Sequence, residues 1–201
     1  MKNMDPKYII ELTVKLFATC VVVAGLLGVV NKVTEPNITA INKAKTEEAM
    51  KAVVADADNS SFSDPLEITA EMEAAAASAG ASVTEAYEVQ VGGAPAGHAL
   101  KIVASGSQGN IEMMVGLDAD GAVTGVSVVK NSETAGIGSK VMDNEPNAKG
   151  VGVLDQFIGK SAADGALNVG SNVDAITGAT VSTKGVTTGV NAAIAVAGVL
   201  G

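Results

Sequence analysis

The sequence predicts an α+β protein in which a single N-terminal transmembrane helix precedes one globular domain with an antiparallel sheet and flanking helices. Three observations support this prediction: an uncharged apolar run near the N-terminus, a middle region rich in valine and isoleucine between glycine-containing turns, and apolar residues at helical spacing near the C-terminus. The chain has 201 residues, which is enough for one membrane anchor and one domain of ordinary size.

The predicted transmembrane helix is centred on residues 17–30, which contain no charged residue. A helix needs ~20 mostly apolar residues to cross the hydrocarbon core, so the span must begin near Thr13 and end at Val33 or Thr34. Positive charge favours the cytoplasmic side, and the lysines at or before this end of the span are Lys2, Lys7 and Lys15. The sequence therefore predicts a single-pass protein of the cytoplasmic (inner) membrane, with a cytoplasmic N-terminus and an extracytoplasmic main domain.

A cleaved signal peptide is the alternative interpretation of the apolar run. Residues 31–36 (NKVTEP) follow the run and contain no small-x-small pattern for a signal peptidase. We therefore expect an uncleaved anchor.

Composition excludes several classes of function. The formal net charge is −9, without the clustered Lys and Arg that neutralise phosphates, so nucleic acid is not an expected partner. Cys20 is the only cysteine and lies inside the apolar run, so this chain alone cannot form a disulfide, a thiolate zinc site or an iron–sulfur cluster. His98 is the only histidine and stands in a glycine- and proline-rich stretch that we expect to be a loop. A lone loop histidine is far more often solvated than catalytic, so we assign it no role. No metal site and no catalytic residue are predicted, and any redox chemistry must come from a bound cofactor.

The expected organisation has three parts: a cytoplasmic tip and anchor (1–35), a helical stalk (36–80) and the main domain (81–201). Pro36 is expected to close the anchor region. In the stalk, residues 37–57 are expected to form a charged helix, residues 59–65 a polar turn, and residues 66–78 a second helix that ends at Gly80.

The main domain begins with apolar, β-branched stretches that are typical of strands; they span residues 83–91, 99–104, 111–117 and 122–129. Residues 118–121 (DADG) separate the last two stretches and predict a tight hairpin turn. An EF-hand loop is less favoured, because Ala122 stands where a third oxygen ligand is needed. Residues 105–109 are interpreted as a loop between antiparallel strands, not a phosphate loop, because no lysine or helix follows. A short helix is expected over residues 155–158.

A lone threonine near the C-terminus stands in a run of very small residues. Residues 174–180 (DAITGAT) combine a glycine that permits close backbone approach with alanines of little bulk, and Asp174 can form hydrogen bonds or be recognised by a modifying enzyme. Ser182 and Thr183 are good N-caps, so a helix is expected to begin two or three residues after Thr180, with its positive end facing any phosphate there. An ordinary loop and helix cap is the alternative.

Residues 174–180 resemble the D-x-x-[ST]-G-A-T sequence onto which a flavin transferase places FMN. Residues 133–138 (ETAGIG) resemble an E-T-P-G-[LI]-G loop, with Ala135 in place of proline. Together with residues 109–121 and 154–157, these matches follow the order of an FMN-binding domain. That domain is shared by the G subunit of Rnf-type electron-transport complexes and the C subunit of the sodium-pumping NADH:quinone reductase.

The resemblance implies that FMN is joined to Thr180 through a phosphoester, with Gly178 and Ala179 close to the phosphate. It implies that the backbone around Thr134, Gly136, Ile137 and Gly138 lies against the isoalloxazine. The remaining cofactor-binding residues that it implies are Glu133, Asp174 and Thr177.

The same resemblance implies an electron-carrier subunit. Its partners would be other membrane and peripheral subunits of a redox complex, and a flavin transferase during maturation. We expect the Rnf-type G subunit, in a complex that couples electron transfer between ferredoxin and NAD⁺ to Na⁺ or H⁺ movement. The quinone reductase C subunit, a cofactor-free scaffold domain and a domain with noncovalent FMN remain as alternatives.

Overall fold

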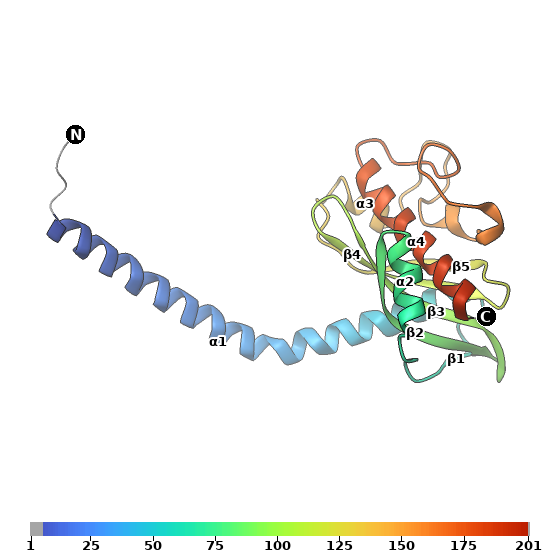
Figure 1. Cartoon of the computed structure of the whole chain (residues 1–201), viewed down its shortest axis with the longest axis horizontal. Helices are drawn as coiled ribbons and strands as arrows, with labels where there is room; N and C mark the ends of the chain where they lie inside the picture. Colours follow the sequence, from blue (N-terminus) through green and yellow to red (C-terminus); the bar gives the residue numbers. More distant parts are fainter. Residues whose placement is uncertain (1–5, 201) are drawn as a thin grey trace. The chain divides into compact units, whose positions relative to one another are not determined.

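The computed structural model describes residues 6–200. The chain divides into two compact units, Met1–Ala44 and Lys45–Gly201. Residues 6–44 of the first unit belong to a long helix, and the second unit contains a sheet with helices and loops (Figure 1).

Helix α1 (Pro6–Ala52) continues through Pro36. The prediction that Pro36 closes the anchor region before a separate helix was therefore wrong. Proline removes one backbone N–H and crowds the preceding turn, but its φ is that of a helix, so it can remain inside one. Thr34 and Thr39 flank it, and each hydroxyl donates to the carbonyl four residues earlier at 2.9 Å. Side-chain hydrogen bonds thus lie on both sides of the missing backbone bond.

The N-terminal part of α1 has the properties of a membrane span. Its most apolar stretch of 18 residues has a mean hydropathy of 2.2, and none of that stretch is buried. Helix α4 (Thr180–Leu200) is also long and apolar enough, but 56% of its corresponding stretch is buried. Because α4 is a core helix of the second unit, the single N-terminal span that the sequence predicted is confirmed.

The second unit contains one antiparallel sheet with the strand order β1-β2-β3-β4-β5. This confirms the predicted antiparallel arrangement and the α+β class. The strands are β1 (Ser60–Phe62), β2 (Ala81–Val91), β3 (Ala94–Ser105), β4 (Asn110–Asp118) and β5 (Val123–Lys130). Strand β1 lies in the segment predicted as a polar turn. It forms because its short backbone pairs with the edge of β2, with Ser60 opposite Val91.

The turn between β4 and β5 forms where the sequence predicts it. The Asp118 carboxylate accepts hydrogen bonds from the N–H groups of Asp120 (3.0 Å) and Ala122 (2.8 Å), and Gly121 has a φ of 75°. The predicted hairpin turn is therefore confirmed. His98 was expected in a loop, but it lies in β3 opposite Leu117, because the glycine-rich stretch provides the turn and the beginning of the strand.

Helices cover both faces of the sheet. Helices α2 (Ala70–Ser78) and α4 pack on one face, where Ile102 and Val190 belong to the same buried cluster. The part of α1 that belongs to the second unit covers the other face, where Met50 packs with Met114. The long segment between β5 and α4 contains three short helices: α3 (Ser139–Met142), η1 (Asp155–Phe157) and η2 (Ala162–Asp164).

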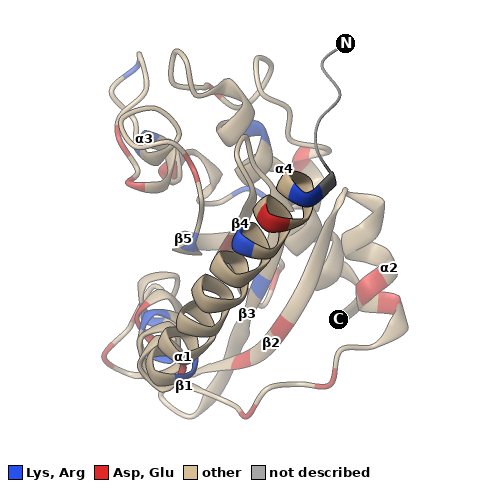
Figure 2. Ribbon diagram, turned by 90° about the vertical axis from the view of Figure 1, so that its left-hand side faces the viewer, with Lys and Arg blue, Asp and Glu red and all other residues tan. Residues whose placement is uncertain are grey.

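Charge is predominantly acidic, and acidic positions recur on α2 and β2 (Figure 2). One acidic side chain of β2 belongs to a half-buried cluster. Glu85 accepts hydrogen bonds from the Lys101 ammonium at 2.8 Å and the Tyr87 hydroxyl at 2.6 Å. Partial burial alone would raise the pKa of Glu85, but these two donors outweigh burial and lower that pKa. Burial, together with the Glu85 carboxylate, raises the pKa of Tyr87.

Candidate functional site

The segment predicted to accept a cofactor (residues 174–180) ends at the first residue of α4. Thr180 is exposed and follows a turn at Thr177 and Gly178, where Gly178 has a φ of 88°. A left-handed backbone of this kind strongly favours glycine. The predicted helix start, two or three residues after Thr180, was wrong.

The start differs because the two expected caps have other partners. The Thr183 hydroxyl donates to the Ala179 carbonyl at 3.0 Å, and the Ser182 hydroxyl donates to the Glu133 carboxylate. The Thr183 N–H also donates to the Ala179 carbonyl, at 2.9 Å, so the first helical hydrogen bond closes on Ala179. An α-helix leaves its first N–H groups without intrahelical partners, and an alanine side chain cannot accept from them.

The second predicted segment, the ETAGIG loop (residues 133–138), lies against this first turn of α4. A Cβ added at Gly138 would stand 2.8 Å from the Ser182 hydroxyl oxygen, so the two segments touch at a position where only glycine fits. Within the loop, the Ile137 N–H donates to the Thr134 carbonyl at 3.2 Å. The Ile137 side chain is 51% exposed, and Gly136 has a φ of 76°.

Asp174, at the beginning of the acceptor segment, is held by other parts of the chain. The Gln156 side chain accepts from the Asp174 N–H at 2.8 Å and donates to the Asp174 carbonyl at 2.9 Å. The Asp174 carboxylate forms an ion pair with Lys149 at 2.7 Å. The structure thus brings Glu133 and Gly138 to the first turn of α4, and ties Asp174 to η1 and the loop after α3.

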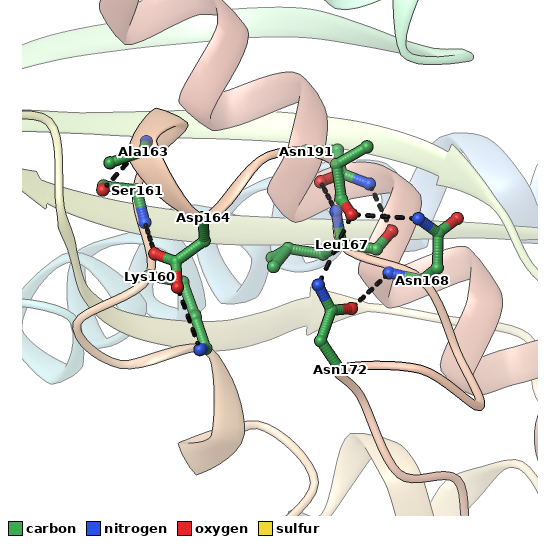
Figure 3. A network of polar contacts seen from close by, with 9 residues as sticks. Lys160, Ser161, Ala163, Asp164, Leu167, Asn168, Asn172 and Asn191 are labelled. Carbon is green, nitrogen blue, oxygen red and sulfur yellow. Dashed lines mark hydrogen bonds and ion pairs between the residues drawn. The ribbon is translucent and has the colours of Figure 1, made fainter.

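A polar network fixes the chain just before the acceptor segment (Figure 3). The Asn191 side chain of α4 accepts from the Leu167 N–H and donates to the Leu167 carbonyl, both at 2.9 Å. The Ser161 N–H and the Lys160 ammonium both donate to the Asp164 carboxylate and lower its pKa. Residues 160–168 are therefore held by side-chain bonds at both ends.

Comparisons with known proteins match this region. A family model described as an FMN-binding domain matches residues 106–195. The chain is 33% identical to the G subunit of the Na⁺-translocating ferredoxin:NAD⁺ oxidoreductase complex of Acetobacterium woodii, over 96% of this chain and 94% of that protein. This chain belongs to the family of G subunits of ion-translocating oxidoreductase complexes.

Other members of this G-subunit family show similar coverage. The G subunit of the ion-translocating oxidoreductase complex of Methanosarcina acetivorans is 28% identical over 94% of this chain and 95% of its own. The G subunit of the proton-translocating ferredoxin:NAD⁺ oxidoreductase complex of Clostridium ljungdahlii is 30% identical over 96% of this chain and 94% of its own. The family resemblance that the sequence motifs indicated is confirmed.

The residues at the start of α4 fit a flavin phosphate. An exposed hydroxyl stands at a helix N-terminus that follows Ala179, whose methyl group cannot cap the helix, and such a terminus attracts anions through its N–H groups and its dipole. A Cβ added at Gly136 or Gly178 would meet no atom within 4 Å, so the backbone is open to a ligand at both turns. The exposed Ile137 side chain offers an aliphatic surface for a flat ring.

Sequence reasoning missed the contacts that organise this site. Ser182 and Asn191 each pair with a group at least 24 positions away in the chain. Gln156 was noted only as part of a short helix, although its amide holds the backbone of Asp174. The sequence gives little signal for this role, because a half-buried glutamine that pairs with a backbone cannot be told from an exposed glutamine by residue type.

Proposed function

We propose that this subunit carries FMN covalently, as a phosphoester on Thr180, and relays electrons within an ion-translocating oxidoreductase complex. The observation that carries the proposal is the exposed Thr180 at the start of α4, inside the region that matches the FMN-binding domain. The helix terminus contributes ~0.3–1 kcal/mol toward a phosphate at this position. The flavin supplies the redox chemistry when bound, and the protein fixes its position and environment.

Other residues support the phosphate and the ring in this proposal. Thr177, Gly178 and Ala179 border the phosphate, and Asp174 stands at the beginning of the same segment. The ETAGIG loop provides the surface for the isoalloxazine through Thr134, Gly136, Ile137 and Gly138, with Glu133 at its start. Lys184 is exposed one helical turn after Thr180 and has no ion-pair partner within residues 6–200, so its ammonium is available to a phosphate.

Attachment requires a flavin transferase and an activated flavin nucleotide. The Thr180 hydroxyl oxygen forms a bond to the phosphorus on the flavin side of a pyrophosphate. The bond from that phosphorus to the leaving nucleotide breaks, and the hydroxyl proton is released. The covalent link then retains the cofactor in a domain that we place outside the cytoplasm, where a lost FMN is not readily replaced.

The assembly is proposed from the relatives. The A. woodii and C. ljungdahlii proteins are named for ferredoxin:NAD⁺ oxidoreductase complexes, one Na⁺-translocating and one proton-translocating. We propose the same electron donor and acceptor pair for the complex that contains this chain, and either ion as the coupled species. Membrane and peripheral subunits are its partners, α1 is its anchor with a cytoplasmic N-terminus, and residues 81–201 form the FMN-binding domain in the proposed organisation.

Peptide mapping of protein purified from native membranes tests the covalent link. Trypsin cleaves after Lys160 and Lys184, so a single peptide contains Thr177, Thr180, Ser182 and Thr183. Fragmentation of this peptide should place the mass of FMN less one water on Thr180. Denatured wild-type protein should stay yellow. The Thr180→Ala variant should be colourless. The Ser171→Ala variant removes an exposed hydroxyl from the same peptide outside the acceptor segment, and should retain the label as the matched control.

The outcomes separate the alternatives. Flavin that is released on denaturation, with an unmodified tryptic peptide, would show noncovalent FMN and contradict the proposed phosphoester on Thr180. A colourless wild-type protein from native membranes would support a scaffold role. Co-purified subunits distinguish an Rnf-type complex from the quinone reductase.

A further inference from the structure

Both oxygens of the Glu133 carboxylate accept hydrogen bonds from other segments of the chain. One oxygen accepts hydrogen bonds from the N–H groups of Ser107 at 2.7 Å and Gln108 at 3.2 Å. The other oxygen accepts from the Ser182 hydroxyl. Ser107 and Gln108 belong to the turn between β3 and β4, and Ser182 belongs to the first turn of α4. One side chain therefore joins three segments that are distant in sequence.

Close packing around Glu133 leaves little freedom to rearrange. A Cβ added at Gly138 would stand 2.8 Å from the Glu133 Cβ, and a Cβ added at Gly106 would stand 2.9 Å from the Gly109 carbonyl oxygen. Contacts below 3.0 Å are essentially never found for real Cβ atoms, so both glycines are required where they stand. The backbone of the loop is also fixed at its start, because the Glu133 N–H donates to the Asn131 side chain at 3.0 Å.

No lysine lies within ion-pair distance of Glu133 among residues 6–200. The carboxylate is balanced by backbone N–H groups and one hydroxyl alone. Hydrogen bonds to a charged group are roughly twice as strong as neutral ones, and they carry geometric specificity. This arrangement suits a residue that sets the position of a loop.

We propose that Glu133 is a positioning residue that docks the ETAGIG loop and the β3–β4 turn onto the first turn of α4, with both oxygens committed to the protein and not to the flavin. Its relevance to FMN rests on the proposed function of Thr180. The docking itself precedes attachment, so the protein without flavin already presents the loop beside the acceptor threonine.

Hydrogen exchange tests the docking without any flavin. Full-length chain in detergent, carrying Thr180→Ala, serves as the background. In that background, Glu133→Ala should raise exchange on the order of tenfold or more at the amides of Ser107 and Gln108, because their shared acceptor is gone. Exchange at residues 134–139 should rise as well, because the loop is no longer docked onto α4. Glu133→Gln should stay near the background rate, because its carbonyl oxygen accepts from both amides and its NH₂ group can donate to Ser182.

Two further variants complete the test. Ser182→Ala should loosen the loop less than Glu133→Ala, since it removes one of three donors. Glu112→Ala removes the carboxylate that pairs with Lys130 at 3.3 Å on the sheet, and should leave exchange in the loop unchanged. Unaltered exchange in Glu133→Ala would overturn the proposal.

The flavin-bearing protein provides the second readout. With Thr180 intact and the transferase present, Glu133→Gln should incorporate flavin normally with an unshifted absorption spectrum, and Glu133→Ala should incorporate less. A shifted spectrum in Glu133→Gln, together with background exchange in Glu133→Ala, would make Glu133 a flavin ligand and contradict the proposal. If wild-type Thr180 carries no flavin while the exchange results hold, the proposed function fails and the docking role stands.

Discussion

The Gln156 side chain binds both backbone groups of Asp174, accepting from its N–H at 2.8 Å and donating to its C=O at 2.9 Å. An amide side chain that pairs in this way satisfies a backbone N–H and C=O as a neighbouring strand would. It thereby fixes the first residue of the acceptor segment. The same Gln156 NH₂ group also lies 3.3 Å from the Val153 carbonyl, which ties the segment to the loop before η1.

Replacing Gln156 with leucine should therefore destabilise the second unit by ~1–3 kcal/mol, because two part-buried backbone groups lose their partners while the volume is conserved. Urea unfolding measures the loss, and incorporation of flavin should fall with it. Gln90→Leu on β2 is the control, since its side chain makes no hydrogen bond within the described residues, and it should change stability by under ~0.5 kcal/mol. Equal stabilities for the two variants would contradict the bracing role of Gln156.

Gly178→Ala should lower stability by ~1 kcal/mol or more. The added methyl meets no atom within 4 Å, so the whole cost is the φ of 88°, which disfavours any residue with a Cβ. Gly198→Ala in α4 is the matched substitution: it also meets open space but has an ordinary helical backbone, and should stabilise by up to ~1 kcal/mol. Thermal unfolding of the two variants should shift in opposite directions, and a shared sign would refute this account of the turn.

Acidification should weaken the cluster of Glu85, Tyr87 and Lys101. The folded pKa of Glu85 is lowered, so its contribution to the free energy of unfolding is present above the unfolded pKa and is lost as the pH falls through the folded value. At pH 6, Glu85→Gln should cost about 1 kcal/mol. Urea unfolding should show this gap to wild type narrowing toward pH 3.

Two observations check the assignment of that pH effect. Glu88 lies on the same strand, is exposed and has no ion pair in the described chain, so Glu88→Gln should show no such gap. The Tyr87 pKa is raised, so its contribution is present below the unfolded value near 10 and is lost only as the pH rises through the folded value. A gap for Glu85→Gln that is unchanged between pH 6 and pH 3 would rule out an ionised Glu85 as its source.

Thr124→Val should cost ~1–2 kcal/mol. The Thr124 hydroxyl donates to the Val53 carbonyl at 2.6 Å, and valine keeps the shape while it removes the donor from a part-buried site. Thr84→Val provides the comparison, because its hydroxyl reaches the Lys101 carbonyl at 3.2 Å on an exposed face, where water can replace it. Urea unfolding that ranks Thr84→Val as the more costly change would disprove this interpretation.

The sequence predicted the elements whose pattern is local. Four strands showed β-branched runs, and the turn at Asp118 carried its own carboxylate acceptor. Strand β1 could not be predicted, because Ser60 and Ser61 have no strand pattern and become a strand only through the edge of β2. Pro36 could not be placed either, because a helix interior and a helix boundary are both compatible with its fixed φ.

For the site, motif order indicated the family, which the comparisons confirm, and the acceptor segment, whose role stays a prediction. The start of α4 was misjudged because Ser182 is a good cap by residue type, and its actual partner lies 49 residues away. Residue type alone does not show whether a hydroxyl accepts from a helix N–H as a cap or donates to a distant carboxylate. The roles of the individual flavin-site residues stay predictions.

The packing of α1 against the sheet determines where the chain can be cut for expression. Ala49, Met50 and Val53 are each at most 7% exposed, and they cover the face of the sheet that α2 and α4 leave open. A fragment that starts after Val53 would expose Met114 and its apolar neighbours to water, and this surface would promote aggregation. A fragment intended for work without detergent should therefore begin near Lys45. It would then lack the membrane span and keep the last turns of α1, which cover this face of the sheet.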